Sequence, residues 1–208
     1  MNSFTYKDAR ISFIGHAAFK INIGTITIYI DPFKIPDKMP PADFILVSHG
    51  HYDHCDSTDI EKISKESTII ITTEEAKKKL KGNIQVIDQR ENIIIKGITI
   101  ASMPAYNIDK PYHPKGVGVG FIIDTGKSRI YFAGDTDYTE EMEKLKDIDI
   151  CLVPIGRTYT MDEKEAAEFV NHIKPKVAVP MHYGTISQGD PIEFKRLTDP
   201  SIDVQIMA

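Results

Sequence analysis

Residues 49–54 hold a dense cluster of side chains that could bind a metal. This hexapeptide contains three histidines and one carboxylate: His49, His51, Asp53 and His54. Neutral imidazole suits Zn, Fe, Ni or Cu, and a carboxylate can bind the same ions or orient a bound water. His49 and His51 are two residues apart, whereas a helical zinc site repeats histidine at i and i+4, so this cluster needs an extended or turning backbone. The pattern predicts a metal site; the alternative is a polar surface loop rich in histidine.

Two more potential ligands follow predicted strands later in the chain. Asp135 comes just after the apolar run 129–133, and His182 comes just after 177–180. Polar groups gathered at the same ends of several strands are where α/β sheets bind their ligands. Each residue also has a simpler explanation, because Asp135 could form an Asx turn before Thr136 and His182 could be a core histidine.

Short strands and helices are expected to carry these residues. The run 43–47 before the cluster is typical of a buried strand, and the alternation in 25–30 indicates a sheet with one buried face. The remaining strands are predicted at 10–15, 17–23, 67–72, 84–87, 92–95, 98–102, 117–124, 129–133, 149–154, 177–180 and 203–207, and helices near 60–63, 74–82, 139–145, 163–173 and 191–197. Residues 103–115 read as a polar loop that contains proline.

Length and composition indicate a soluble globular protein. The 208 residues are expected to form one domain, 1–208, of which 41% are apolar and 26% charged. The net charge of −5 does not favour nucleic acid as a partner, and no apolar run is long enough to span a membrane. Without a recognisable secretory segment, we expect a cytoplasmic protein whose two cysteines are reduced thiols. Cys55 is expected to be a small buried residue beside the cluster rather than a ligand.

The motifs, taken together, resemble those of the metallo-β-lactamase-fold hydrolases. The chain contains His-x-His-x-Asp-His at 49–54, Gly-Asp-Thr at 134–136 and Pro-x-His-x-Gly at 180–184, in the family's order. The resemblance implies an α+β fold, a four-layer αβ/βα sandwich with metals at one edge of two sheets. It also implies two divalent ions, Zn first, with Mn, Ni or Fe as alternatives. His49 and His51 would bind the first ion, Asp53, His54 and His182 would bind the second, and Asp135 would bridge them.

The first ion needs one more ligand, and here the chain departs from the family pattern. Many members have a histidine in the loop that corresponds to 103–115, but this chain has Asn107 near the expected point and His113 six residues later. We expect His113 to be the ligand; otherwise Asn107 completes the site or only one metal binds. The resemblance also implies that Asp31 supports the ligands from behind. His16 could do likewise, and the alternative is a core histidine that bonds to backbone.

The implied chemistry is hydrolysis by a metal-bound hydroxide, with Asp53 binding one ion and orienting the hydroxide. The tracts 15–19, 30–33 and 181–185 resemble a branch of small hydrolases related to L-ascorbate-6-phosphate lactonases and phospholipase-D-type phosphodiesterases. We therefore expect a small anionic substrate with a phosphoester, phosphodiester or lactone/ester bond. Candidate substrate-binding residues are Asn107, Lys115 and Arg157, although loop charges are often simply solvated. The alternatives are a metallo-nuclease and a non-catalytic module that binds a metal or ligand; the oligomeric state stays open.

Overall fold

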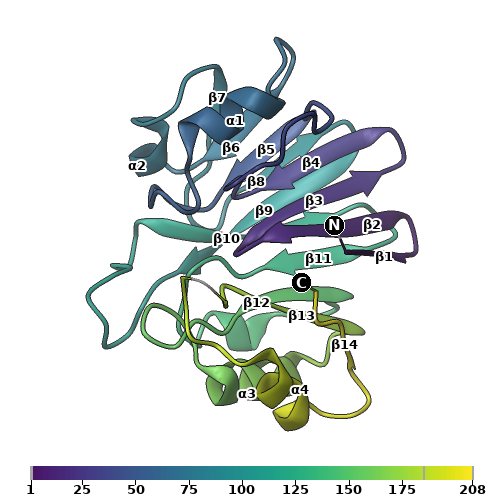
Figure 1. The fold of residues 1–208 in the computed structure, drawn as a ribbon, viewed down its shortest axis with the longest axis vertical. Helices are drawn as coiled ribbons and strands as arrows, with labels where there is room; N and C mark the ends of the chain where they lie inside the picture. The colour runs from purple at the N-terminus through teal and green to yellow at the C-terminus, as the bar shows by residue number, and fades with distance from the viewer. Residues whose placement is uncertain (1, 185, 208) are drawn as a thin grey trace. The chain divides into compact units, whose positions relative to one another are not determined.

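The computed structural model describes residues 2–184 and 186–207, and Figure 1 shows the course of the chain. Thr185, the last residue of the tract 181–185, lies outside the described residues. The chain divides into two compact units, which meet in sequence between Asp88 and Gln89. The single domain expected over 1–208 therefore stays a prediction, and each unit is described by itself. No helix in the described part of the chain is both long and apolar enough to cross a membrane.

The first unit is a seven-stranded sheet whose strands pair in sequence order. Its strands are β1 (Ser3–Tyr6), β2 (Ala9–Gly15), β3 (Ala18–Ile23), β4 (Ile26–Ile30), β5 (Phe44–Val47), β6 (Ile69–Thr72) and β7 (Asn83–Val86). The pairs from β1 to β4 are antiparallel and those from β4 to β7 are parallel. All four residues of β5 are buried, as expected for a parallel strand that is covered on both faces. The parallel pairing brings the carboxyl ends of β4 and β5 to one edge, where Asp31 and the histidine cluster begin.

Two helices cover part of this sheet, α1 (Ser57–Ile63) and α2 (Glu74–Lys77). The Asp56 side chain caps α1 by accepting hydrogen bonds from the backbone N–H groups of Thr58 and Asp59. Ile60 and Ile63 of α1 belong to the same buried apolar cluster as residues of β4 and β5. The cap and this apolar contact fix where the segment leaves the histidine cluster.

The second unit is another seven-stranded sheet, in the order β14-β13-β12-β11-β10-β9-β8. Its strands are β8 (Asn92–Ile95), β9 (Ile98–Ala105), β10 (Gly118–Asp124), β11 (Arg129–Phe132), β12 (Ile150–Pro154), β13 (Val177–Met181) and β14 (Asp203–Val204). The strands from β8 to β11 are antiparallel and those from β11 to β14 are parallel. The carboxyl ends of β11, β12 and β13 therefore share one edge, and Asp135, Gly156 and His182 follow those ends.

Helical segments of this unit are η1 (Met142–Lys144), α3 (Glu163–Ile173) and α4 (Pro191–Leu197). In Figure 1, α3 and α4 lie side by side, and α3 packs against α4 and β12. Ala166, Ala167, Phe169 and Val170 form the buried stripe of α3. The Asp162 side chain caps this helix through the backbone N–H of Glu165.

Several elements differ from the sequence-based expectation. The predicted helix 139–145 is only the 3-10 turn η1, and the predicted strand 203–207 is β14, which ends at Val204. β1 is an additional strand at residues that the sequence pattern left unassigned, and α2 ends at Lys77 instead of near Gly82. β9 continues to Ala105, into a segment that was expected to be loop. Pro104 is tolerated there because β8 pairs only with residues 98–101, so the missing N–H breaks no hydrogen bond on that side.

Candidate metal centre

In the first unit, Asp31 organises the histidine cluster from a fully buried position after β4. Its carboxylate accepts hydrogen bonds from Ser48 N at 2.7 Å, Ser48 Oγ at 2.6 Å and His54 Nδ1 at 2.7 Å. Burial raises the pKa of Asp31, and the hydrogen bonds from His54 and Ser48 act against that rise. Because a carboxylate only accepts, His54 carries its proton on Nδ1 and presents the lone pair of Nε2.

Ser48 places the proton of His49 on Nδ1 as well. Its hydroxyl donates to Asp31, so Ser48 Oγ acts as the acceptor for His49 Nδ1, 2.9 Å away. His49 therefore also presents Nε2 as its ligand atom, the arrangement that supporting groups commonly impose on metal-binding histidines. Asp31, His49 and His54 each offer one ligand atom within 4.8 Å of the others.

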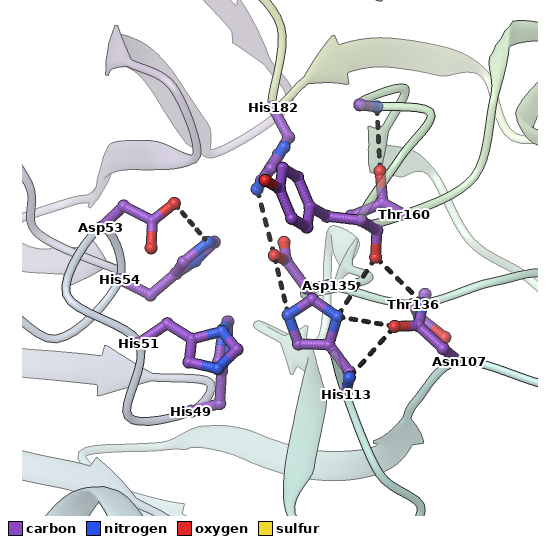
Figure 2. Close-up of polar contacts among 12 residues, drawn as sticks. His49, His51, Asp53, His54, Asn107, His113, Asp135, Thr136, Thr160 and His182 are labelled. Carbon is purple, nitrogen blue, oxygen red and sulfur yellow. Dashed lines mark hydrogen bonds and ion pairs between the residues drawn. The ribbon is translucent and has the colours of Figure 1, made fainter. Parts of the chain in front are cut away.

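The other two members of the cluster lie close to this pair. His51 is exposed, and its Nδ1 lies 3.1 Å from His49 Nε2. Asp53 is buried, and its Oδ2 lies 3.0 Å from His16 Nε2 and 3.8 Å from His54 Nε2. Figure 2 shows the rings of His49, His51 and His54 with the Asp53 carboxylate. His16, expected to be a supporting residue, thus contacts a proposed ligand directly.

In the second unit, Asp135 lies between two histidines, as Figure 2 shows. Its Oδ2 is 3.2 Å from His113 Nε2 and 3.0 Å from His182 Nε2, and all three side chains are at most 5% exposed. His113 Nδ1 faces two acceptors, Asn107 Oδ1 at 2.9 Å and Tyr159 O at 3.1 Å, so that nitrogen carries the proton. The lone pair of His113 Nε2 therefore faces the carboxylate. A shared cation stabilises such an arrangement of two acceptors, so this donor set fits a divalent metal.

Local backbone geometry shapes both donor clusters. His16, Asp31 and His182 have φ angles of 54°, 43° and 59°, in the left-handed region that residues other than glycine rarely adopt. Such conformations cost of order 1–3 kcal/mol each and concentrate at functional sites. Gly156 leaves room for His182, because a Cβ at this position would lie 2.5 Å from His182 Nδ1.

The three expected substrate-binding residues all have partners within the second unit. Asn107 is buried, and both ends of its amide are hydrogen-bonded. Lys115 Nζ binds Glu141 Oε1 at 3.0 Å, and Arg157 binds Glu163 through a two-pronged contact with bonds of 2.7 and 3.0 Å. The side chains of Lys115 and Arg157 remain 60% and 47% exposed. Their role in substrate binding stays a prediction, since an anion would compete with these carboxylates.

Besides Asp31, three residues that the sequence did not indicate contact the ring nitrogens of proposed ligands. Ser48, Tyr159 and Ser187 contact His49, His113 and His182, respectively, each at a ring Nδ1. Only Ser48 had a local signal, because it directly precedes the first histidine of the cluster. Tyr159 acts through its backbone carbonyl, so the identity of its side chain carried no information about the contact.

Comparison with known proteins identifies the family. The model of the beta-lactamase superfamily domain matches residues 10–182. A UPF0173 metal-dependent hydrolase from Methanopyrus kandleri is 34% identical over 221 residues, covering 95% of each chain. This chain belongs to the UPF0173 metal-dependent hydrolases of the beta-lactamase superfamily. The predicted enzyme class, a metal-dependent hydrolase, is confirmed.

Solved structures of similar chains support the same fold. A protein from Parabacteroides distasonis has a TM-score of 0.90 at 36% identity, covering 99% of this chain and 97% of its own. A metallo-β-lactamase superfamily protein from Thermotoga maritima has a TM-score of 0.67 at 26% identity, covering 95% of this chain and 97% of its own. The predicted metallo-β-lactamase fold of the α+β class is confirmed.

Proposed function

We propose that this UPF0173 protein cleaves a phosphoester, phosphodiester or lactone/ester bond in a small anionic substrate. One observation carries the hydrolytic part of the proposal: in the second unit, His113 and His182 direct Nε2 at the same oxygen of Asp135. This is a donor set of the kind that metallohydrolases use. The bond type rests on the resemblance of the tracts 15–19 and 30–33 to lactonase and phosphodiesterase sequences.

We assign the ligands as the family resemblance implies. On that resemblance His49, His51 and His113 would hold one ion, Asp53, His54 and His182 would hold the other, and Asp135 would serve both. Zn²⁺ is the first choice because imidazole and carboxylate are its common ligands, and Mn, Ni and Fe are the alternatives. His113 is favoured over Asn107 because the Asn107 amide is already engaged at both ends, whereas His113 Nε2 points at Asp135. Bound divalent ions supply an activated water and polarise the oxygen of the scissile bond.

The chain's own residues then orient the reaction. Asp53 accepts a proton from the attacking water or orients it, and His16 Nε2, 3.0 Å from Asp53 Oδ2, fixes that carboxylate. Asp31 and Ser48 keep Nε2 of His54 and His49 deprotonated. Lys115 and Arg157 carry the exposed positive charges that would attract an anionic group. A cytoplasmic location fits the two cysteines, which are both free thiols.

The test combines metal analysis with hydrolysis assays. Purified protein is stripped of metal, reloaded separately with Zn, Mn, Ni or Fe, and assayed on p-nitrophenyl phosphate, bis-p-nitrophenyl phosphate and a set of lactones. We expect near two ions per chain and turnover that returns with metal. If the protein binds two ions and cleaves single-stranded DNA or RNA but none of these compounds, the nuclease alternative replaces the proposal.

Two histidine variants of the second unit make the assay specific. His182→Ala should lose metal and nearly all turnover. His172→Ala is the matched control, because His172 lies on α3 and its Nε2 contacts the carbonyl of Glu143 instead of the donor cluster. Equal metal content in both variants would contradict the assignment of His182.

A further inference from the structure

We infer that Asn107, Asp137 and Lys110 form a positioning relay that fixes the His113 ring for metal binding through Nε2. The inference rests on the proposed metal site and adds residues to it. All members of the relay belong to the second unit, and Figure 2 shows Asn107 beside the His113 ring. None of the three needs to touch a metal or a substrate for the relay to work.

Asn107 is the first step of the relay. Its Nδ2 donates to two acceptors, Asp137 Oδ1 at 3.0 Å and Tyr159 O at 2.9 Å, so the orientation of the amide is determined. Its Oδ1 must then face His113, where it accepts from the backbone N–H at 3.1 Å and from ring Nδ1 at 2.9 Å. The backbone N–H of Asn107 also donates to the carbonyl of His113 at 2.8 Å. Asn107 therefore holds both the backbone and the ring of the same histidine.

Asp137 and Lys110 form the second step. Asp137 Oδ1 accepts from Lys110 Nζ at 2.6 Å, and Asp137 Oδ2 accepts from the backbone N–H of Ile108 at 2.9 Å. The Asp137 side chain is only 7% exposed, and a buried carboxylate without a cation would be costly. Lys110 Nζ also donates to Thr160 O at 2.6 Å, next to the carbonyl of Tyr159 that receives His113 Nδ1. One lysine thus anchors both groups that accept the His113 proton.

The donors and acceptors of the relay determine which nitrogen of the His113 ring carries the proton. Lys110 can only donate, so Asp137 accepts, Asn107 Nδ2 donates to Asp137, and Asn107 Oδ1 accepts from His113. The His113 proton is therefore confined to Nδ1, and the lone pair of Nε2 points at Asp135. Supporting partners of this kind typically change metal affinity about 10–100-fold when they are removed. A loop that was merely stabilised by these contacts would not require a particular histidine tautomer.

The first experiment reads the tautomer directly. Long-range ¹H–¹⁵N spectra of the metal-free wild-type protein at alkaline pH should show His113 with its proton on Nδ1. Asn107→Ala should shift the ring toward the Nε2–H form. Asn171→Ala is the matched control, because Asn171 makes the same two kinds of amide contact, to Leu197 O and from Asp199 N, and contacts none of the relay. An Nε2–H ring in the wild type, or an unchanged ring in Asn107→Ala, would overturn the relay.

The second experiment measures zinc affinity by competition with a chelator. Asn107→Ala and Lys110→Met should each bind the zinc ion assigned to His113 about 10–100-fold less tightly, while Asn171→Ala binds as the wild type does. His113→Ala removes the proposed ligand itself, so it tests the assignment of His113 separately from the relay. If His113→Ala binds zinc more weakly but Asn107→Ala binds it as the wild type does, the relay alone is overturned. If both variants bind zinc as the wild type does, the assignment of His113 is overturned as well. If Asn107→Ala does not fold, Lys110→Met and the wild-type tautomer decide the question.

Discussion

Replacing Asp31 by asparagine should reverse the proton positions on two histidines with a single substitution. Asp31 Oδ1 accepts from Ser48 N, and Oδ2 accepts from both Ser48 Oγ and His54 Nδ1. In Asp31→Asn, the amide oxygen can still accept from Ser48 N, but the new NH₂ group occupies the place of Oδ2 and must donate. His54 Nδ1 then has to accept, so its proton moves to Nε2.

The reversal continues through Ser48. When the hydroxyl accepts from the asparagine NH₂, its own proton turns toward His49 Nδ1, which is 2.9 Å away. His49 must then also carry its proton on Nε2. Both histidines would present N–H groups where a metal needs lone pairs, and loading the site would require breaking this hydrogen-bond pattern.

Asp31→Asn should have one effect on zinc affinity and another on the free energy of unfolding of the metal-free protein. Loss of a supporting partner weakens metal affinity about 10–100-fold per histidine. Because His49 and His54 are assigned to different ions, each ion should bind about 10–100-fold less tightly, or roughly 1–3 kcal/mol per ion. The metal-free variant should still fold, because each hydrogen bond can form again with opposite polarity. Exchanging charge-assisted for neutral hydrogen bonds costs about 1 kcal/mol each, and removing a fully buried charge offsets part of this loss. We expect the metal-free variant to be destabilised by about 1–3 kcal/mol.

The assay compares zinc affinity with the free energy of unfolding in urea. Asp59→Asn is the matched control, because Asp59 is a buried aspartate of the same unit that accepts from the backbone N–H of Ile35 and contacts no proposed ligand. The control should bind zinc as the wild type does. Affinities of both zinc ions within about threefold of wild type in Asp31→Asn would refute the reasoning, since a loss of about 10–100-fold is expected for each ion. So would histidine ring spectra that do not change.

Three further predictions concern other parts of the chain. Gly156→Ala should weaken zinc binding and lower turnover, because the new Cβ would lie 2.5 Å from His182 Nδ1; zinc titration of the folded variant checks this, and unchanged affinity would contradict it. Burial disfavours ionised Glu141, but hydrogen bonds from a lysine and a tyrosine outweigh burial and lower its pKa to about 2. Ionised Glu141 therefore stabilises the fold above its ordinary pKa of 4.5, and this stabilisation is lost as the pH falls toward 2. Between these pH values, the free energy of urea unfolding should depend less on pH in Glu141→Gln than in the wild type. Burial raises the pKa of the Cys55 thiol to about 12, so neither Cys55 nor the fully buried Cys151 should react with a thiol reagent at mildly alkaline pH until the protein is unfolded; rapid labelling of the native protein would be the opposite result.

Much of the fold was predictable because its signals are local. The apolar run 43–47 predicted the buried strand β5, and Asp162 marked the start of α3, because strand burial and helix capping depend on neighbouring residues. The strand at Pro104 was not predictable, because proline is tolerated only where the neighbouring strand β8 has already ended. That condition depends on a pairing partner and has no trace in the residues around Pro104.

The sequence by itself determined the chemistry of the candidate site: the clustered histidines, the order of the later motifs and, through them, the class of hydrolase. Only the tertiary structure decided which atoms can do that chemistry. The proton on His54 is set by Asp31, 23 residues away in sequence, and the proton on His49 by Asp31 through Ser48. The proton on His113 is set by Asn107 and by a backbone carbonyl 46 residues away. A histidine's identity is written in the sequence, but its tautomer depends on which donors and acceptors the folded chain packs against each ring nitrogen.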